Sequence, residues 1–211
     1  MDGLLINSEP FWRAANVRVL SRHEFTITEE DVHKMAGTNT DALVAHWRNI
    51  FGWDESNDQT IINEIVADVA AQVAQSGTAL PGVYDLVRDL TAADVPLAVA
   101  SSSPMYLIEI ALKKLGIHDS FQIIRSASAE LHNKPFPNVY LSVARDLKLT
   151  PDTCLVLEDS IVGVTAAKAA GMICIAVPEI PYEASRFETA DLIIDSLTSV
   201  TVDQLLNFQP R

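Results

Sequence analysis

Apolar residues recur at helical spacing through the first third of the chain. Between about residues 9 and 76 they return every three to four positions, which is typical of amphipathic helices. In the segment 58–75, for example, Ile61, Ile65 and Val69 would share one face. The pattern predicts four helices, over about 9–20, from just after Thr28, over about 41–51 and over about 58–75.

From Gly77 onward, short apolar runs alternate with segments of helical spacing. The runs predict strands over about 96–100, 122–125, 153–157, 173–177 and 192–194. The segments around them predict helices over about 80–92, 104–115, 137–146 and 161–170, and a last helix closes the chain. Strands that alternate with helices in this way form parallel βαβ units. The chain therefore divides into a helical module followed by an α/β module.

The charge balance limits which partners the protein can bind. The formal net charge of −13 gives a diffuse negative field, which opposes binding to nucleic acid and to anionic membranes. An anionic substrate would therefore need a local cation or a metal ion at its site. The proportions of hydrophobic residues, 48%, and of charged residues, 20%, are ordinary for a globular protein.

The sequence shows neither a secretory leader nor a membrane span. No basic region is followed by an apolar stretch at the N-terminus, and no apolar run approaches the ~20 residues that a span needs. We therefore expect a soluble cytoplasmic protein. Cys154 and Cys174 lie in the apolar runs TCLVL and ICIAV, which indicate buried strands, and we expect both to be reduced core thiols.

Polar residues gather in four short segments, at the chain start and at the ends of predicted strands. These are Met1–Leu5, Ala100–Pro104, Asn133–Pro135 and Leu157–Ser160. Alone, each has an ordinary structural explanation: Ser103 would cap a helix, and the acidic Glu158 and Asp159 would favour a helix start. In parallel sheets, however, ligands bind at the carboxyl ends of the strands.

Together, the four segments supply the groups that phosphoryl transfer requires. Hydroxyl and N–H groups at a helix start can hold a phosphate, and Lys134 can neutralise its charge. Two adjacent carboxylates at a strand end suit Mg²⁺, which prefers oxygen ligands. We therefore expect Ser101, Lys134 and Asp159 to converge at one cleft.

The motifs DGLLINSEPFW, ASSSP, NKPFPNVY and LEDSIVGVTAAKAAGM resemble the haloacid dehalogenase (HAD) superfamily, in its sugar phosphatase and β-phosphoglucomutase-like branch. The resemblance covers essentially the whole chain. It implies an α/β fold, with a Rossmann-like parallel sheet in residues 1–8 and 77–211 and an inserted all-α helical cap in residues 9–76. It also implies that a monomer hydrolyses a small phosphorylated sugar or polyol, with Mg²⁺ as cofactor and without nucleic acid or membrane partners.

The resemblance assigns roles in catalysis and phosphate binding to four residues. Asp2 matches the general acid/base, and its backbone carbonyl would also bind the metal. Ser101 matches the phosphate-binding hydroxyl, helped by the backbone N–H of Ser102. Lys134 matches the lysine that stabilises the nucleophile and the phosphate.

The resemblance also implies the metal ligands and the nucleophile. Asp159 matches the direct Mg²⁺ ligand, and Glu158 matches the carboxylate that holds the metal, often through water. The family's nucleophile is the first aspartate of Asp-Met-Asp-Gly. We expect this aspartate, with the first central strand of the sheet, to lie immediately before Met1 and outside these 211 residues. The strands that end at Ala100 and Leu157 would then border an open apolar slot.

Other activities are possible within the same fold. The mutases carry a histidine in the first cap helix and an arginine after the cap's glycine. In this chain, Trp12 stands at the position of the histidine, and Thr40, three residues after Gly37, stands at the position of the arginine. Both replacements favour hydrolysis over transfer of the phosphate back to a sugar. The dehalogenase hypothesis is less well supported, because Asp2 supplies the acid/base that a phosphatase needs. A non-catalytic sugar-phosphate binder is the remaining alternative, and the coding sequence upstream of Met1 would separate it from an enzyme.

Overall fold

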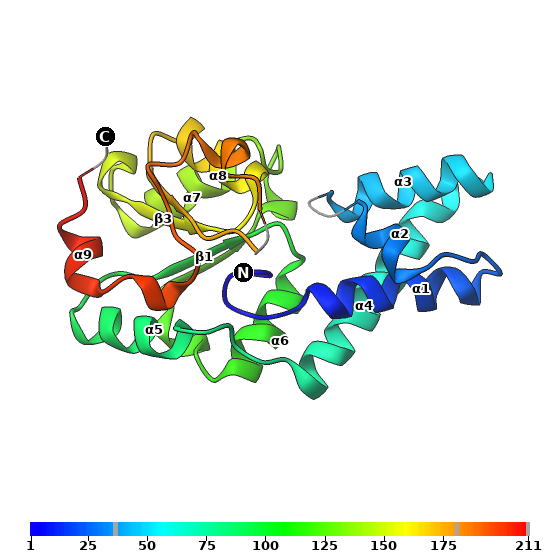
Figure 1. The fold of residues 1–211 in the computed structure, drawn as a ribbon, viewed down its shortest axis with the longest axis horizontal. Coiled ribbons are helices and arrows are strands. Elements are labelled where there is room, and N and C mark those ends of the chain that lie inside the picture. The colour runs from blue at the N-terminus through cyan, green and yellow to red at the C-terminus, as the bar shows by residue number, and fades with distance from the viewer. Residues whose placement is uncertain (36–37, 180–181, 210–211) are drawn as a thin grey trace. The chain divides into compact units, whose positions relative to one another are not determined.

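The chain forms two compact units in a computed structural model that describes residues 1–35, 38–179 and 182–209. One unit combines Met1–Asn7 with Thr78–Arg211, and the other is Ser8–Gly77. Figure 1 shows both units as ribbons, and each is described by itself below. The boundaries expected from the sequence, after residues 8 and 76, each lie one residue from these.

The smaller unit consists of helices. They are α1 (Glu9–Arg22), α2 (Glu29–His33), α3 (Thr40–Phe51) and α4 (Asp58–Ser76). The predicted apolar face of α4 is confirmed, because Ile61, Ile65 and Val69 are buried where α1 and α3 pack on this helix. Arg18 of α1 donates from both Nε and Nη2 to the Asp68 carboxylate of α4, which links the two helices.

The larger unit contains parallel strands joined by helices. The strands are β1 (Ala98–Ser101), β2 (Ile123–Ser126), β3 (Leu155–Glu158), β4 (Ile173–Ala176) and β5 (Leu192–Ile193). The helices are α5 (Val83–Ala92), α6 (Met105–Leu115), α7 (Asn138–Leu147), α8 (Ile161–Ala169) and α9 (Val202–Leu206). All the strand pairs are parallel, as the alternation of strands and helices predicts.

Helices cover the strands on both sides. α7 contacts β1 and β2, α8 contacts β3 and β4, and α5 and α6 lie on the opposite side in Figure 1. Small side chains such as Ala166 and Ala167 let α8 pack closely on β4, whose Cys174 is fully buried. Both cysteines carry free thiols. No helix within the described ranges has the length and apolar character that crossing a bilayer demands.

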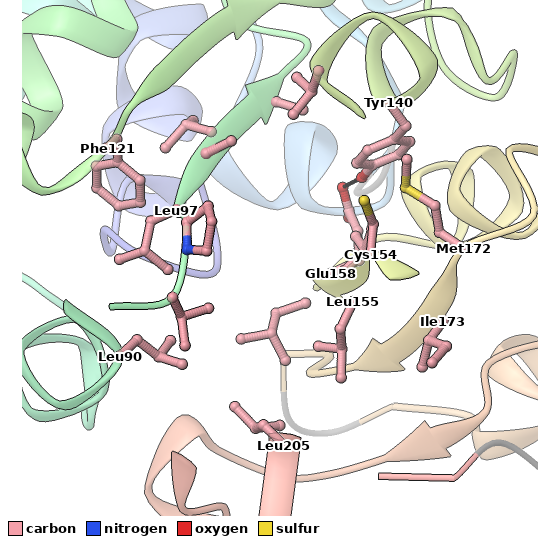
Figure 2. A pocket seen from close by; sticks show the side chains of 18 of the residues that line it. Leu90, Leu97, Phe121, Tyr140, Cys154, Leu155, Glu158, Met172, Ile173 and Leu205 are labelled. Carbon is pink, nitrogen blue, oxygen red and sulfur yellow. Dashed lines mark hydrogen bonds between the residues drawn. The ribbon is translucent and has the colours of Figure 1, made fainter. Parts of the chain in front are cut away.

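The strands form two separate sheets, β1-β2 and β3-β4-β5. An apolar cavity of about 420 Å³ is lined by residues of both β1 and β3, together with Met1, Leu4 and Leu5. Figure 2 shows the side chains around this space. Neither β1 nor β3 has a strand partner on its second edge among the described residues. The cavity is therefore bordered by β1 and β3, the strands at which the two sheets end.

The cavity also corrects one expectation from the sequence. The run TCLVL predicts a buried strand with Cys154 as a core thiol, but Cys154 and the β3 residues Leu155, Val156 and Leu157 are only partly buried. Their neighbours Cys174 and Ile175 in β4 are fully buried. The two strands differ because β3 borders the cavity, whereas β4 has a paired strand on each side.

Candidate active site

The polar segments predicted from the sequence meet at the carboxyl ends of β1 and β3. Ser101 ends β1 and Glu158 ends β3. Lys134 reaches both ends, because its Nζ donates to the Ala100 carbonyl oxygen at 3.2 Å and contacts the Glu158 carboxylate. The loop that carries Lys134 therefore joins the ends of the two sheets.

The ammonium group of Lys134 is buried, with only 6% of its side chain exposed. Besides Glu158 and the Ala100 carbonyl, it faces the ring of Tyr140, whose centroid lies 4.8 Å from Nζ. A buried charge is stable only when it is paired and hydrogen-bonded, and these three groups meet that requirement. Removing any one of them would leave the ammonium less compensated.

Glu158 accepts hydrogen bonds on both of its carboxylate oxygens. Oε1 accepts from Lys134 and from the Tyr140 hydroxyl, the latter at 2.6 Å. Oε2 accepts from the backbone N–H of Ser160 at 3.2 Å and from its hydroxyl at 3.0 Å. Burial opposes ionisation, but the charges of Lys134 and of the Met1 amino group, with the donated hydrogen bonds, lower the pKa of Glu158 to about 2.

These contacts bear on the metal role expected for Glu158. An ionised carboxylate offers about four lone-pair positions, and protein donors use that number here. A direct bond from Glu158 to a metal would displace one of them. In this geometry, Glu158 therefore holds Lys134.

The glycine at position 163 makes room for this carboxylate. A Cβ atom at Gly163 would overlap the Glu158 carboxyl group. The N–H of Gly163 donates to the Ser160 hydroxyl at 3.1 Å, which caps α8. The turn after β3 thus holds both the helix start and the Glu158 side chain in place.

Asp159 differs from its neighbour because its negative charge is poorly compensated. Burial and the adjacent Glu158 charge raise the pKa of Asp159 to about 7. Its carboxylate lies against the backbone of Gly3, which has a φ of +66° and no room for a Cβ atom. A partly buried carboxylate with excess negative charge nearby is a place where a cation would be stabilised.

The oxygen donors here fit Mg²⁺ in kind but only partly in number. Asp159 offers a carboxylate of the type that Mg²⁺ prefers, and the nearby Asp2 segment offers backbone carbonyls. Within the part of the chain that the structure describes, no three His, Cys, Asp or Glu side chains are grouped to hold a metal ion. The described residues thus offer oxygen donors of the kind that Mg²⁺ prefers, without a group of three such side chains.

Ser103 corrects another expectation from the sequence. The residue before α6 is Pro104, and no side-chain cap hydrogen bond forms there, so Ser103 does not cap this helix. Instead, its hydroxyl donates to Asp2 Oδ2 at 2.7 Å. This hydrogen bond ties the predicted general acid/base to the loop after β1.

The loop after β1 and the Lys134 loop are tied together through Asn133. Its Oδ1 accepts from the Ser102 hydroxyl at 3.0 Å and from the Lys134 backbone N–H at 2.8 Å. The Ser101 hydroxyl accepts from the Ser103 N–H at 3.1 Å, which tightens the turn. The structure therefore brings the four polar segments together, shows contacts of Ser103 and Asn133 within them, and adds Tyr140 from outside them.

Replacing Asp159 with asparagine is expected to stabilise the metal-free chain at pH 8. The pKa of Asp159 is raised to about 7 from an ordinary 3.8, so the folded state binds the extra proton between these values. Stability therefore falls as the pH rises from about 4 to 7, and the loss persists above pH 7. Asp159→Asn should remove a penalty of as much as about 4 kcal/mol.

Denaturant unfolding of the parent and of Asp159→Asn from pH 4 to pH 8, without divalent cations, measures this effect. The two curves should converge near pH 4. Asp152→Asn, at an exposed carboxylate before β3, is the matched control and should follow the parent. A gap between parent and Asp159→Asn that widens toward acid pH would contradict the assignment.

Comparison with known proteins places this geometry in context. Residues 1–177 match the family described as haloacid dehalogenase-like hydrolase. Hexitol phosphatase B of Escherichia coli (strain K12) is 34% identical over 208 residues, covering 98% of this chain and 94% of the relative.

Two solved structures have the same fold. CbbY from Rhodobacter sphaeroides, in complex with xylulose-(1,5)bisphosphate, is similar with a TM-score of 0.83 and 24% identity, over 93% of this chain and 92% of that one. β-Phosphoglucomutase from Clostridium difficile gives a TM-score of 0.79 and 20% identity, over 97% and 92%. The α/β fold with a parallel sheet, predicted from the sequence motifs, is confirmed.

Proposed function

This chain belongs to the haloacid dehalogenase-like hydrolases, and from that premise we propose that it is a Mg²⁺-dependent phosphatase of small sugar or sugar-alcohol phosphates. The observation that carries the proposal is the buried Lys134, which joins the ends of β1 and β3. It provides the local cation that an anionic substrate needs on a chain with a net charge of −13.

The residues at the carboxyl ends of β1 and β3 can each take one role in the hydrolysis of a phosphate ester. The Ser101 hydroxyl and the Ser102 N–H would bind the phosphate, while Lys134 balances its charge. Asp2, oriented by Ser103, would give a proton to the leaving oxygen of the sugar. Catalysis of phosphoryl transfer rests on this positioning and charge balance.

The nucleophile in this proposal is an aspartate directly before Met1, which would form an aspartyl-phosphate intermediate. The cavity supports this placement, because its apolar lining and the second edges of β1 and β3 suit one parallel strand. A strand that runs into Met1 would end at the carboxyl edge of the sheet, beside Asp2 and Lys134.

Magnesium would be held by the Asp159 carboxylate and the Asp2 backbone carbonyl, together with the proposed aspartate. Bound there, it supplies positive charge that neutralises the phosphate. The raised pKa of Asp159 supports this assignment, because a divalent cation would favour the ionised carboxylate.

Mutase activity is the alternative within the same fold. Trp12 lies in α1 and Thr40 begins α3, and by resemblance these positions correspond to the histidine and the arginine of the mutases. Gly37, which sets that comparison, lies outside the described residues. Neither side chain can act as the histidine or arginine of a mutase, so hydrolysis is favoured.

A substrate panel tests the proposed function. The protein extended by the proposed upstream strand is assayed for phosphate release from hexose, pentose and hexitol phosphates, with Mg²⁺ and with excess chelator. We expect release only with Mg²⁺, and we expect Ser101→Ala to lower kcat/KM by about 100-fold. Ser120→Ala, in the turn after α6, is the matched control. Isomerised sugar phosphate without free phosphate would instead identify a mutase, and no turnover of any compound would contradict both activities.

A further inference from the structure

Tyr140 is a buried polar group that the proposed chemistry leaves unused. It lies in the first turn of α7 and is 5% exposed. Most of its neighbours are apolar, and it belongs to the core cluster that packs α7 against α8. Its hydroxyl nevertheless ends at the candidate active site, where it donates to Glu158 Oε1 at 2.6 Å. Figure 2 shows this hydrogen bond at one end of the cavity.

Tyr140 contacts both members of the ion pair that holds Lys134. Its hydroxyl and the Lys134 ammonium share Oε1 of Glu158, and its ring faces the ammonium at 4.8 Å. The hydroxyl therefore limits where the carboxylate can move, and the ring limits where the ammonium can move. A ring face attracts a cation without taking up one of its N–H donors.

The ammonium has three N–H groups, and their use decides what Lys134 can bind. Among the described residues, Glu158 and the Ala100 carbonyl accept two of them. The third is available for an oxygen of a phosphate. The direction of this third N–H depends on the first two contacts and on the ring beside them. A shift of Glu158 would therefore turn the N–H away from a bound phosphate.

We infer that Tyr140 is a positioning residue, which aims the third N–H of Lys134 at a bound phosphate by fixing Glu158 and flanking the ammonium. The inference rests on the proposed function for its phosphate ligand. It concerns binding geometry, however, and so can be measured without turnover. Nothing in the spacing of the sequence motifs assigns this role to Tyr140.

Tyr140→Phe is the sharpest variant, because it keeps the ring and removes only the hydroxyl. Inorganic phosphate binding by the 211-residue chain is measured by calorimetry with Mg²⁺ present. We expect an affinity loss on the order of tenfold, the effect of losing about one charge-assisted hydrogen bond at the site. Tyr182→Phe is the matched control, because Tyr182 also donates its hydroxyl to a carboxylate, that of Asp195 at 2.9 Å.

A double variant separates positioning from a general loss of stability. Lys134→Met should weaken phosphate binding, and adding Tyr140→Phe should then cause no further loss of affinity, because Tyr140 acts through Lys134. The inference is overturned if Tyr140→Phe binds as the parent does, if its loss adds fully to that of Lys134→Met, or if the parent binds no phosphate. If the variants change phosphate binding as expected but the extended protein releases no phosphate, the phosphatase proposal is refuted. The role of Tyr140 in phosphate binding is then still supported.

Discussion

A protein in which an apolar strand ending in aspartate precedes Met1 is expected to release phosphate at least 10⁴-fold faster than the 211-residue chain. Loss of a nucleophile from a catalytic group that works as a unit costs on the order of 10⁴ to 10⁶ in rate. Ser101 and Lys134 could still hold a phosphate in the 211-residue chain. Asp2 is a poor substitute nucleophile, because Ser103 holds its carboxylate.

The matched control carries the same strand with asparagine in place of the aspartate. It should be as inactive as the 211-residue chain, although its strand still fills the cavity. Both extended proteins should melt on the order of 10 °C higher than the 211-residue chain, because the strand pairs with β1 and β3 and fills about 420 Å³ of apolar space. Comparable turnover in all three proteins would refute the phosphatase proposal, and equal melting temperatures would refute the placement of the strand.

The secondary structure can be predicted because each element repeats one simple pattern. The segment 58–75 differs from α4 by one residue, since apolar side chains on every turn pack against α1 and α3. The run ICIAV predicts β4 for a similar reason, because this strand is covered on both sides. The spacing of apolar residues reflects which side chains are buried against neighbouring elements. It predicts a helix or strand reliably where those neighbours are present along the whole element.

The roles of single polar residues could not be predicted in this way. Ser103 reads as a helix cap because caps are local, but its partner Asp2 is 101 positions away in sequence. Tyr140 receives no role from the sequence, because its hydroxyl finds its partner Glu158 only once α7 lies beside the end of β3. The role of Glu158 likewise depends on which donors the fold brings to it. Such contacts follow from tertiary packing and leave no period in the sequence.

Lys134→Met is expected to reduce the kcat/KM of the extended protein by about 10³-fold and to destabilise it by about 3–5 kcal/mol at pH 7. The catalytic loss follows because the variant removes the charge that balances the phosphate. The stability loss follows because Glu158 remains buried without its counterion, and removing one member of a buried pair costs this much. Methionine keeps the length and apolar stem of the side chain, so packing is largely preserved.

Combining Lys134→Met with Glu158→Gln should separate the two effects. The neutral amide needs no counterion and can still accept from Tyr140, so the double variant should regain most of the lost stability while remaining inactive. Phosphate release and denaturant unfolding of the three proteins measure both quantities.

The pH dependence of stability adds a further check on Glu158. Its pKa is lowered to about 2 from an ordinary 4.5, so its ionised form stabilises the parent above pH 4.5. This contribution is lost as the pH falls toward 2. The stability gap between the parent and Lys134→Met should therefore narrow below pH 4.5. Activity that returns together with stability in the double variant would show that Lys134 supports the fold and takes no part in phosphate hydrolysis.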